Sequence, residues 1–169
     1  MITLFSTTKD FINEFKIIQK NALRSWSALD PKIQIIIFGN SQGTREASEE
    51  IGAQHIPDVR CSEAGTPLLS DLFIKAEKMA KYSIMAFVNA DIILPLNFLK
   101  SIQIVSQKYN RFLIMGHRWD MDVKEIINFD EEKARNKFWN AVKEKSKKHA
   151  CTGIDYFVFA KGQFNNIPD

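Results

Sequence analysis

The sequence predicts a single α/β domain with a mostly parallel sheet that is flanked by helices on both faces. Near-continuous apolar runs are typical of parallel strands covered on both sides, and residues 33–38 form the clearest such run. Strand-like runs alternate along the chain with segments whose apolar residues recur at helical spacing. This alternation is typical of α/β domains. A chain of 169 residues can bury one core, so we expect one domain over residues 1–169.

The first half of the chain contains three expected strands and three expected helices. Residues 2–5 begin a strand at once, and the hydroxyls of residues 6–8 are suited to cap the helix that follows. Apolar residues at helical spacing extend that helix to about residue 27. After the break at Asp30 and Pro31, the remaining expected elements are a strand at 33–38, an exposed helix at 41–52, a weak edge strand or loop at 55–57, and a helix at 68–81.

The second half continues the alternation. The expected elements are a strand at 82–89, a helix that begins at Pro95, a strand at 111–116, a charged helix at 131–149 and a last strand at 155–159. Proline is tolerated at the first position of a helix, which supports the start at Pro95. In the charged helix, Ala134, Phe138, Ala141 and Val142 are expected to face inward.

Composition narrows the classes of function. The formal net charge of +3 is too small to indicate nucleic-acid binding. Cys61 and Cys151 lie far apart without metal-ligand spacing, so we expect free thiols in a reducing, cytoplasmic compartment. We see no signal peptide, and no apolar run approaches the length of a transmembrane helix.

Polar residues follow three of the expected strands, at the edge where ligands bind in open α/β sheets. They are Ser6, Thr7 and Thr8 after the first strand, Gly39 and Asn40 after the second, and Asn89 and Asp91 after the central one. A carboxylate buried against apolar residues is costly unless a cation compensates it. Hydroxyls beside one carboxylate suit a ribose, a diphosphate and a hard cation such as Mn²⁺ or Mg²⁺. The alternative is that Asn89 and Asp91 begin a turn before Pro95.

Four groups of residues together resemble the nucleotide-diphospho-sugar transferases of GT-A fold, specifically the small soluble glycosyltransferases. They occupy positions 5–8, 65–71, 87–91, and 116–120 together with 153–157. The resemblance implies metal-dependent transfer of a sugar from a nucleotide diphosphate donor, with a UDP-sugar favoured, to a glycan or another hydroxyl acceptor. In that family the triplet at 89–91 corresponds to an Asp-x-Asp motif. Asn89 departs from it and leaves one carboxylate.

The resemblance also implies a role for each strand-end residue. Asp91 would hold the metal and Asn89 would bind the ribose. Ser6, Thr7 and Thr8 would form the turn that binds the nucleoside, and Gly39 and Asn40 would contact its base or ribose. Gly65 and Thr66 would form the loop that packs beside the sugar nucleotide. Arg118 would face the diphosphate or the sugar, and Trp119 would stack on a face of the sugar.

Several of these residues have simpler alternatives. Thr66 suits a helix N-cap, and Arg118 suits a surface ion pair with Asp120 or Asp122. Trp119 suits an ordinary core or edge position. His55, His117 and His149 are scattered in the sequence, and we expect them to be structural or exposed.

Asp155 is the candidate catalytic base for a reaction that inverts the anomeric centre. An attacking hydroxyl must lose its proton, and Tyr156 and Phe157 are expected to desolvate a carboxylate beside them. The alternative is an Asp that makes a turn before the last strand. Members of the family continue beyond that strand, so the resemblance implies either a minimal enzyme or a chain cut short of its C-terminal segment.

Two other functions remain open. One is a non-catalytic module that binds nucleotide sugars, in keeping with Asn89 and the early C-terminus. The other is a sugar-phosphate nucleotidyltransferase, which is disfavoured because the first strand is not followed by a glycine-rich phosphate loop with a basic residue. The absence of a Gly-x-Gly-x-x-Gly motif there also disfavours an oxidoreductase.

Overall fold

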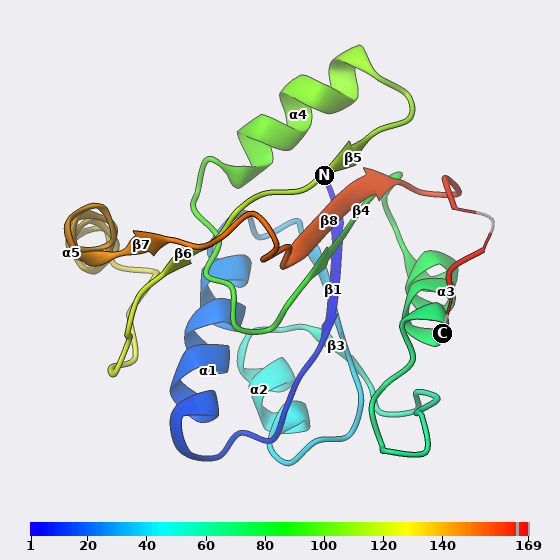
Figure 1. The fold of residues 1–169 in the computed structure, drawn as a ribbon, viewed down its shortest axis with the longest axis horizontal. Coiled ribbons are helices and arrows are strands. Elements are labelled where there is room, and N and C mark those ends of the chain that lie inside the picture. Colours follow the sequence, from blue (N-terminus) through cyan, green and yellow to red (C-terminus); the bar gives the residue numbers. More distant parts are fainter. Residues whose placement is uncertain (165, 169) are drawn as a thin grey trace.

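A computed structural model describes residues 1–164 and 166–168 of the chain. The main sheet has six strands in the order β3-β2-β1-β4-β8-β5, and β6 and β7 form a separate two-stranded ribbon (Figure 1). The strands are β1 (Thr3–Thr7), β2 (Gln34–Phe38), β3 (Gln54–Ile56), β4 (Ile84–Val88), β5 (Leu113–Ile114), β6 (Trp119–Asp120), β7 (Lys147–Lys148) and β8 (Tyr156–Ala160).

One strand of the main sheet, β8, runs opposite to the other five. β1 pairs in parallel with β2 and β4, and β2 pairs in parallel with β3. β8 lies between β4 and β5 and is antiparallel to both. The prediction of a mostly parallel sheet is confirmed. The antiparallel β8 brings the start of the last strand to the carboxyl end of the central strand, a meeting that a uniformly parallel sheet would not produce.

Helices cover both faces of this sheet, as predicted (Figure 1). They are α1 (Asn13–Ser27), α2 (Thr44–Glu50), α3 (Leu69–Met79), α4 (Phe98–Lys108) and α5 (Glu132–Lys145). One core cluster joins the sheet to buried residues of α1, α2 and α4. A second cluster joins the opposite face to α3. In the part of the chain that the structure describes, no helix combines the length and apolar character that crossing a membrane requires.

The second core cluster accounts for much of the chain's phenylalanine. Phe5 and Phe87 of the sheet contact Phe73 of α3, with ring centroids 4.9 and 5.6 Å from it. Phe159 stacks on Phe73 at 5.5 Å and 11°. Edge-to-face and stacked rings add to the stabilisation from apolar burial. This cluster fixes β1, β4 and β8, the strands whose ends form the candidate site.

Some predicted element boundaries are wrong. The first helix begins at Asn13 rather than residue 9, because the Gln19 side chain binds both the N–H and the carbonyl of Lys9 and holds it outside the helix. The helix predicted through residue 149 ends at Lys145, because the chain then pairs with β6 as β7.

Helix α5 stands beside the sheet rather than on it (Figure 1). Of the four residues predicted to face inward, Phe138 is buried, whereas Ala134, Ala141 and Val142 are half-buried.

Candidate functional site

The segment after β4 is held in place by α1. A turn brings the Ile92 N–H to the Asn89 carbonyl, with N and O 3.0 Å apart. The indole N–H of Trp26 donates to the Ile92 carbonyl at 2.8 Å, and the Leu94 N–H donates to the Ser25 hydroxyl at 3.0 Å. Trp26 and Ser25 are both buried. The backbone around Asp91 is therefore anchored to the core by two hydrogen bonds from one helix.

Antiparallel pairing places Asp155 opposite Asn89. The ladder ends with Val88 opposite Tyr156, so the next residues on each strand also meet. The Asn89 N–H donates to the Asp155 carbonyl at 2.9 Å, and Asn89 Nδ2 donates to Asp155 Oδ1 at 3.1 Å. A carboxylate only accepts hydrogen bonds, so the amide must present its nitrogen to Asp155.

Arg118 connects Asp155 to a second carboxylate. Its guanidinium donates to Asp155 Oδ1 at 3.0 Å and to Asp120 Oδ1 at 2.8 Å. His149 Nδ1 lies 2.6 Å from Asp120 Oδ2 and donates to it. The hydrogen bonds from His149 and then Arg118 lower the pKa of Asp120. The ion pair expected between Arg118 and Asp120 is present, whereas Asp122 pairs with Lys124.

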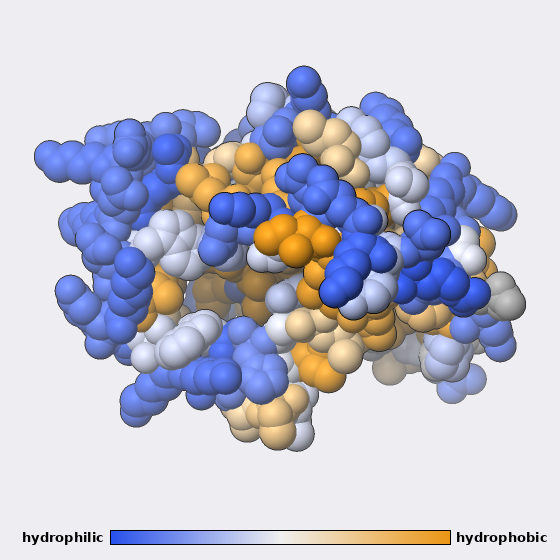
Figure 2. All heavy atoms as spheres, turned by 90° about the horizontal axis from the view of Figure 1, so that it is seen from above, coloured by the Kyte–Doolittle hydropathy of each residue, from blue (hydrophilic) through white to orange (hydrophobic). Residues whose placement is uncertain are grey.

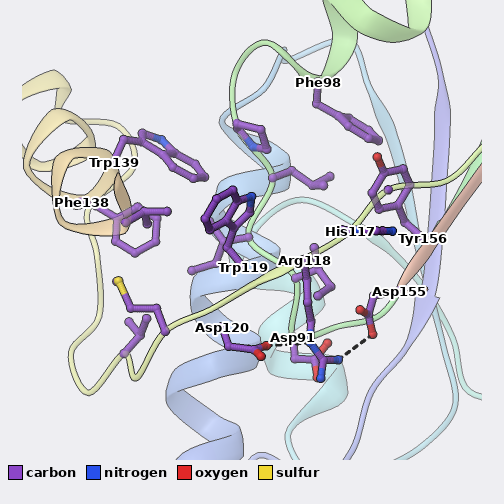
Figure 3. A pocket seen from close by; sticks show the side chains of 18 of the residues that line it. Asp91, Phe98, His117, Arg118, Trp119, Asp120, Phe138, Trp139, Asp155 and Tyr156 are labelled. Carbon is purple, nitrogen blue, oxygen red and sulfur yellow. Dashed lines mark hydrogen bonds and ion pairs between the residues drawn. The ribbon is translucent and has the colours of Figure 1, made fainter. Parts of the chain in front are cut away.

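Asp91 and Asp155 form an incompletely compensated pair of carboxylates (Figure 3). Asp155 is 6% exposed, and its Oδ2 is buried with no hydrogen-bond partner among the described residues. Asp91 is open to the cleft, yet the protein atoms around it displace part of its hydration and raise its pKa. The negative charge of Asp155 raises it further, against the attraction of Arg118 and Lys9. An unpartnered acceptor beside a destabilised carboxylate favours binding of a cation.

These charged residues lie at one end of a cleft of about 900 Å³. Four predicted site residues line the cleft, namely Asp91, Arg118, Trp119 and Asp155. Trp119 is 58% exposed on the edge strand β6, in keeping with the edge-position alternative. Viewed from above, the molecule is hollowed beside the hydrophilic α5 side, with hydrophobic atoms in the depth (Figure 2).

The predicted nucleoside residues lie at the carboxyl ends of β1 and β2, and their hydroxyls differ in availability. Ser6 is buried and donates to the Val88 carbonyl, so its hydroxyl joins β1 to β4. Thr8 shares a hydrogen bond of 2.7 Å with Thr44. By contrast, Thr7 Oγ1 is buried without a partner among the described residues.

Gly39 lies beside the Thr7 hydroxyl. A Cβ at Gly39 would stand 3.2 Å from Thr7 Oγ1, so the glycine, with its φ of +95°, keeps that approach open. Asn40 follows and is exposed.

Gly65 and Thr66 belong to an exposed loop before α3. Gly65 has a φ of +80°, and the Thr66 N–H donates to the Ser62 hydroxyl at 3.2 Å. Neither residue lines the cleft around Asp91. The alternative in which Thr66 caps the helix is wrong, because α3 begins after Leu68 and has no side-chain cap.

The donor set fits a hard divalent cation that is shared with a ligand. Within residues 1–164 and 166–168, no group of three or more His, Cys, Asp or Glu side chains is arranged to hold a metal. Magnesium, however, is commonly held by one or two carboxylates together with substrate phosphates. Asp91, which is exposed and lines the cleft, is a hard oxygen donor of this kind.

Sequence reasoning missed the network around Arg118 and most of the cleft wall. The sequence indicates Asp120 only as an ion-pair partner of Arg118, and no local signal ties His149 to Asp120 across 29 positions. Trp139 lies directly after Phe138, so a wider apolar stripe on α5 would have included it. Tyr156 reaches the cleft because Gly116 has no side chain, since a Cβ there would lie 2.1 Å from the Tyr156 hydroxyl oxygen.

Comparison with solved structures assigns the fold. The structure of S. aureus TarS 1-349 matches with a TM-score of 0.54 and 14% sequence identity, over 73% of this chain and 38% of that one. TarS in complex with UDP-GlcNAc matches with a TM-score of 0.49, 16% identity, and 73% and 37% coverage. Glucosyl-3-phosphoglycerate synthase from Mycobacterium tuberculosis, in complex with Mg²⁺ and uridine diphosphate, matches with a TM-score of 0.41, 12% identity, and 59% and 37% coverage.

Neither a protein-family model nor a curated protein sequence matches the chain. The chain spans less than two fifths of the length of these solved structures. Its fold is the GT-A fold.

Proposed function

We propose that this chain, which has the GT-A fold, is a metal-dependent glycosyltransferase that moves a sugar from a nucleotide diphosphate donor to an acceptor hydroxyl. The observation that carries the proposal is the meeting of Asp91 and Asp155 at the carboxyl end of β4, beside a cleft of about 900 Å³. Ligands of open α/β sheets bind at this edge. Residues 1–169 would act as one nucleotide-sugar-binding domain.

The donor would lie across the ends of β1, β2 and β4. The unpartnered Thr7 hydroxyl is suited to a nucleoside, and Gly39 leaves room beside it. Asn40 is exposed at the end of β2 and free to reach a base. The Asn89 amide nitrogen is engaged by Asp155, and its oxygen remains for a ribose hydroxyl. UDP-GlcNAc is the ligand of one TarS structure, which makes UDP the first nucleotide to test.

Asp91 would hold Mn²⁺ or Mg²⁺ together with the donor's diphosphate. When bound, the cation would neutralise the charge that develops on the leaving diphosphate. Arg118 lies beside the same carboxylates and would add positive charge toward the diphosphate. Gly65 and Thr66, in the loop before α3, would lie beside the sugar nucleotide. Trp119 would contact the sugar from the cleft wall.

Asp155 would take the proton from the acceptor hydroxyl. Its Oδ1 is held by Asn89 and Arg118, which fixes the carboxylate and leaves Oδ2 as the oxygen without a partner. Because Oδ2 is buried, an acceptor must displace protein atoms from it before proton transfer.

The free, exposed Cys61 and Cys151 fit a reducing compartment such as the cytoplasm.

Turnover of a panel of UDP-sugars tests the proposal. We expect Mn²⁺-dependent release of UDP from at least one of UDP-GlcNAc, UDP-glucose and UDP-galactose, because water can replace the acceptor slowly. Asp91→Asn should abolish that release, whereas Asp130→Asn, at an exposed site near α5, should not change it. Metal-dependent UDP binding without any turnover would instead identify a non-catalytic nucleotide-sugar-binding module.

A further inference from the structure

The cleft beside Asp155 has two chemically different parts (Figure 3). The side chains of Asp91, Asp120 and Asp155 gather around Arg118 at one end. The rest of the lining is mostly apolar, and its largest members are Phe98, Trp119, Met121, Phe138, Trp139 and Tyr156. A ligand that fills the cleft therefore meets a cluster of charge at one end and a mainly apolar wall elsewhere, with Asn97, Ser101, His117, Asp122, Lys145 and Lys147 as the polar residues of that wall.

The apolar part exists because α5 does not close onto the sheet. Phe138 is the buried residue of that helix, and it packs edge-on against Phe129 with ring centroids 5.9 Å apart. On the opposite wall, Tyr156 packs edge-on against Phe98 at 5.6 Å. These two aromatic pairs hold the walls from separate elements and leave about 900 Å³ between them and their neighbours. That volume is within the range of sites for drug-sized ligands.

The wall chemistry distinguishes between classes of acceptor. A polar glycan loses water from each buried hydroxyl and needs a hydrogen-bonding partner for each in return. Aliphatic side chains such as Leu94, Val123 and Val142 offer none, and the polar side chains Asn97, Ser101 and His117 are outnumbered by the apolar residues of the lining. An apolar body, by contrast, gains from leaving water along the whole wall.

We propose that the cleft binds an acceptor with an apolar body and a hydroxyl at one end, so that the body lies between α4 and α5 and the hydroxyl reaches Asp155. This deepens the proposed function, on which it rests, by naming the class of acceptor. Trp119 is 58% exposed and lines the cleft, so a bound ligand would cover part of its apolar surface.

Binding of three neutral probes tests the proposal without requiring turnover. They are octyl β-D-glucoside, used below its micelle concentration, methyl β-D-glucoside and maltose, measured by titration calorimetry on the whole chain. We expect octyl glucoside to bind at least tenfold more tightly than methyl glucoside and to change the fluorescence of the cleft tryptophans. Equal affinity for the two glucosides, or a preference for maltose, would overturn the proposal.

Matched substitutions on α5 locate the binding. Val142→Glu puts a charge in the apolar wall and should weaken octyl glucoside at least tenfold. Lys143→Glu changes the adjacent, exposed residue and should leave it unchanged. Both residues are incompletely buried, and the thermal midpoint of each variant shows whether it folds. Undiminished binding by Val142→Glu would place the probe elsewhere and overturn the proposal.

The proposed function is tested separately by UDP with Mn²⁺. Val142→Glu should bind UDP as the wild type does, because Val142 lies away from the ends of β1 and β2. If octyl glucoside binds as expected and UDP does not bind at all, the transferase function fails while the apolar specificity of the cleft is retained. If UDP binds and octyl glucoside does not, the acceptor class is wrong and the donor site stands.

Discussion

The side-chain amide of Asn89 donates to Asp155 Oδ1 at 3.1 Å, and the backbone N–H of Asn89 donates to the Asp155 carbonyl at 2.9 Å. An Asp at position 89 would have no side-chain donor for this contact and would bring a second negative charge to it. The amide at position 89, where the Asp-x-Asp pattern has a carboxylate, is therefore suited to Asp155, which antiparallel pairing places opposite it.

Asn89→Asp should destabilise the metal-free protein at neutral pH. The substitution replaces a hydrogen bond with the approach of two carboxylates, and loss of a buried polar partner typically costs about 1–3 kcal/mol. The loss should shrink as the pH falls toward about 4, because protonation of the introduced carboxyl restores a donor. Urea unfolding of the variant and the wild type at pH 7 and at pH 4 measures the difference in the free energy of unfolding at each pH.

Asn140→Asp provides the control for this charge change, since Asn140 is exposed on α5. It should change the free energy of unfolding little at either pH. If Asn89→Asp were as stable as the wild type at pH 7, the contact with Asp155 would contribute nothing to the fold.

Asp91→Asn should stabilise the metal-free protein at neutral pH. The pKa of Asp91 is raised above 3.8 in the native state, mainly by loss of hydration, so the folded protein holds this proton more tightly than the unfolded chain. The wild type consequently loses stability as the pH rises from about 3.8 through the native pKa, and Asp91→Asn does not. Thermal midpoints from pH 3 to 8 in EDTA should coincide at the acid end and separate above it.

Addition of Mn²⁺ and UDP should reverse that order, because a ligand that binds only the native wild type raises its midpoint. A midpoint of Asp91→Asn that stays below the wild type in EDTA at pH 7 would contradict the assigned cause of the raised pKa.

Asp155→Asn should slow transfer by about 10²–10⁴-fold while UDP and Mn²⁺ still bind, because removal of a general base acts on the chemical step. Asp120→Asn is the matched control, since it removes the other carboxylate partner of Arg118 and leaves Asp155 in place. If Asp155→Asn loses metal-dependent UDP binding, its unpartnered Oδ2 is a metal ligand rather than the base. The anomeric configuration of the product should be determined first, because a retaining reaction does not need this base.

The sequence predicted the sheet, the helices on both faces and the position of Asp91, because buried parallel strands and amphipathic helices have strong local patterns. It did not predict the contact of Asn89 with Asp155, which depends on the direction of β8 and hence on pairing across 66 positions. The two-residue strands β6 and β7 have no periodicity to detect. Trp139 and Tyr156 enter the cleft because α5 stands away from the sheet and Gly116 leaves space, and neither cause is local.

Titration of UDP into the protein with Mn²⁺ and with EDTA, for the wild type and for Asp91→Ala, tests whether Asp91 holds a metal-bound nucleotide. We expect the wild type to bind UDP in Mn²⁺ and to lose at least tenfold in affinity in EDTA, and Asp91→Ala to bind UDP weakly and equally in both. UDP affinity in Mn²⁺ that Asp91→Ala leaves unchanged, or no UDP binding by the wild type, would contradict this expectation.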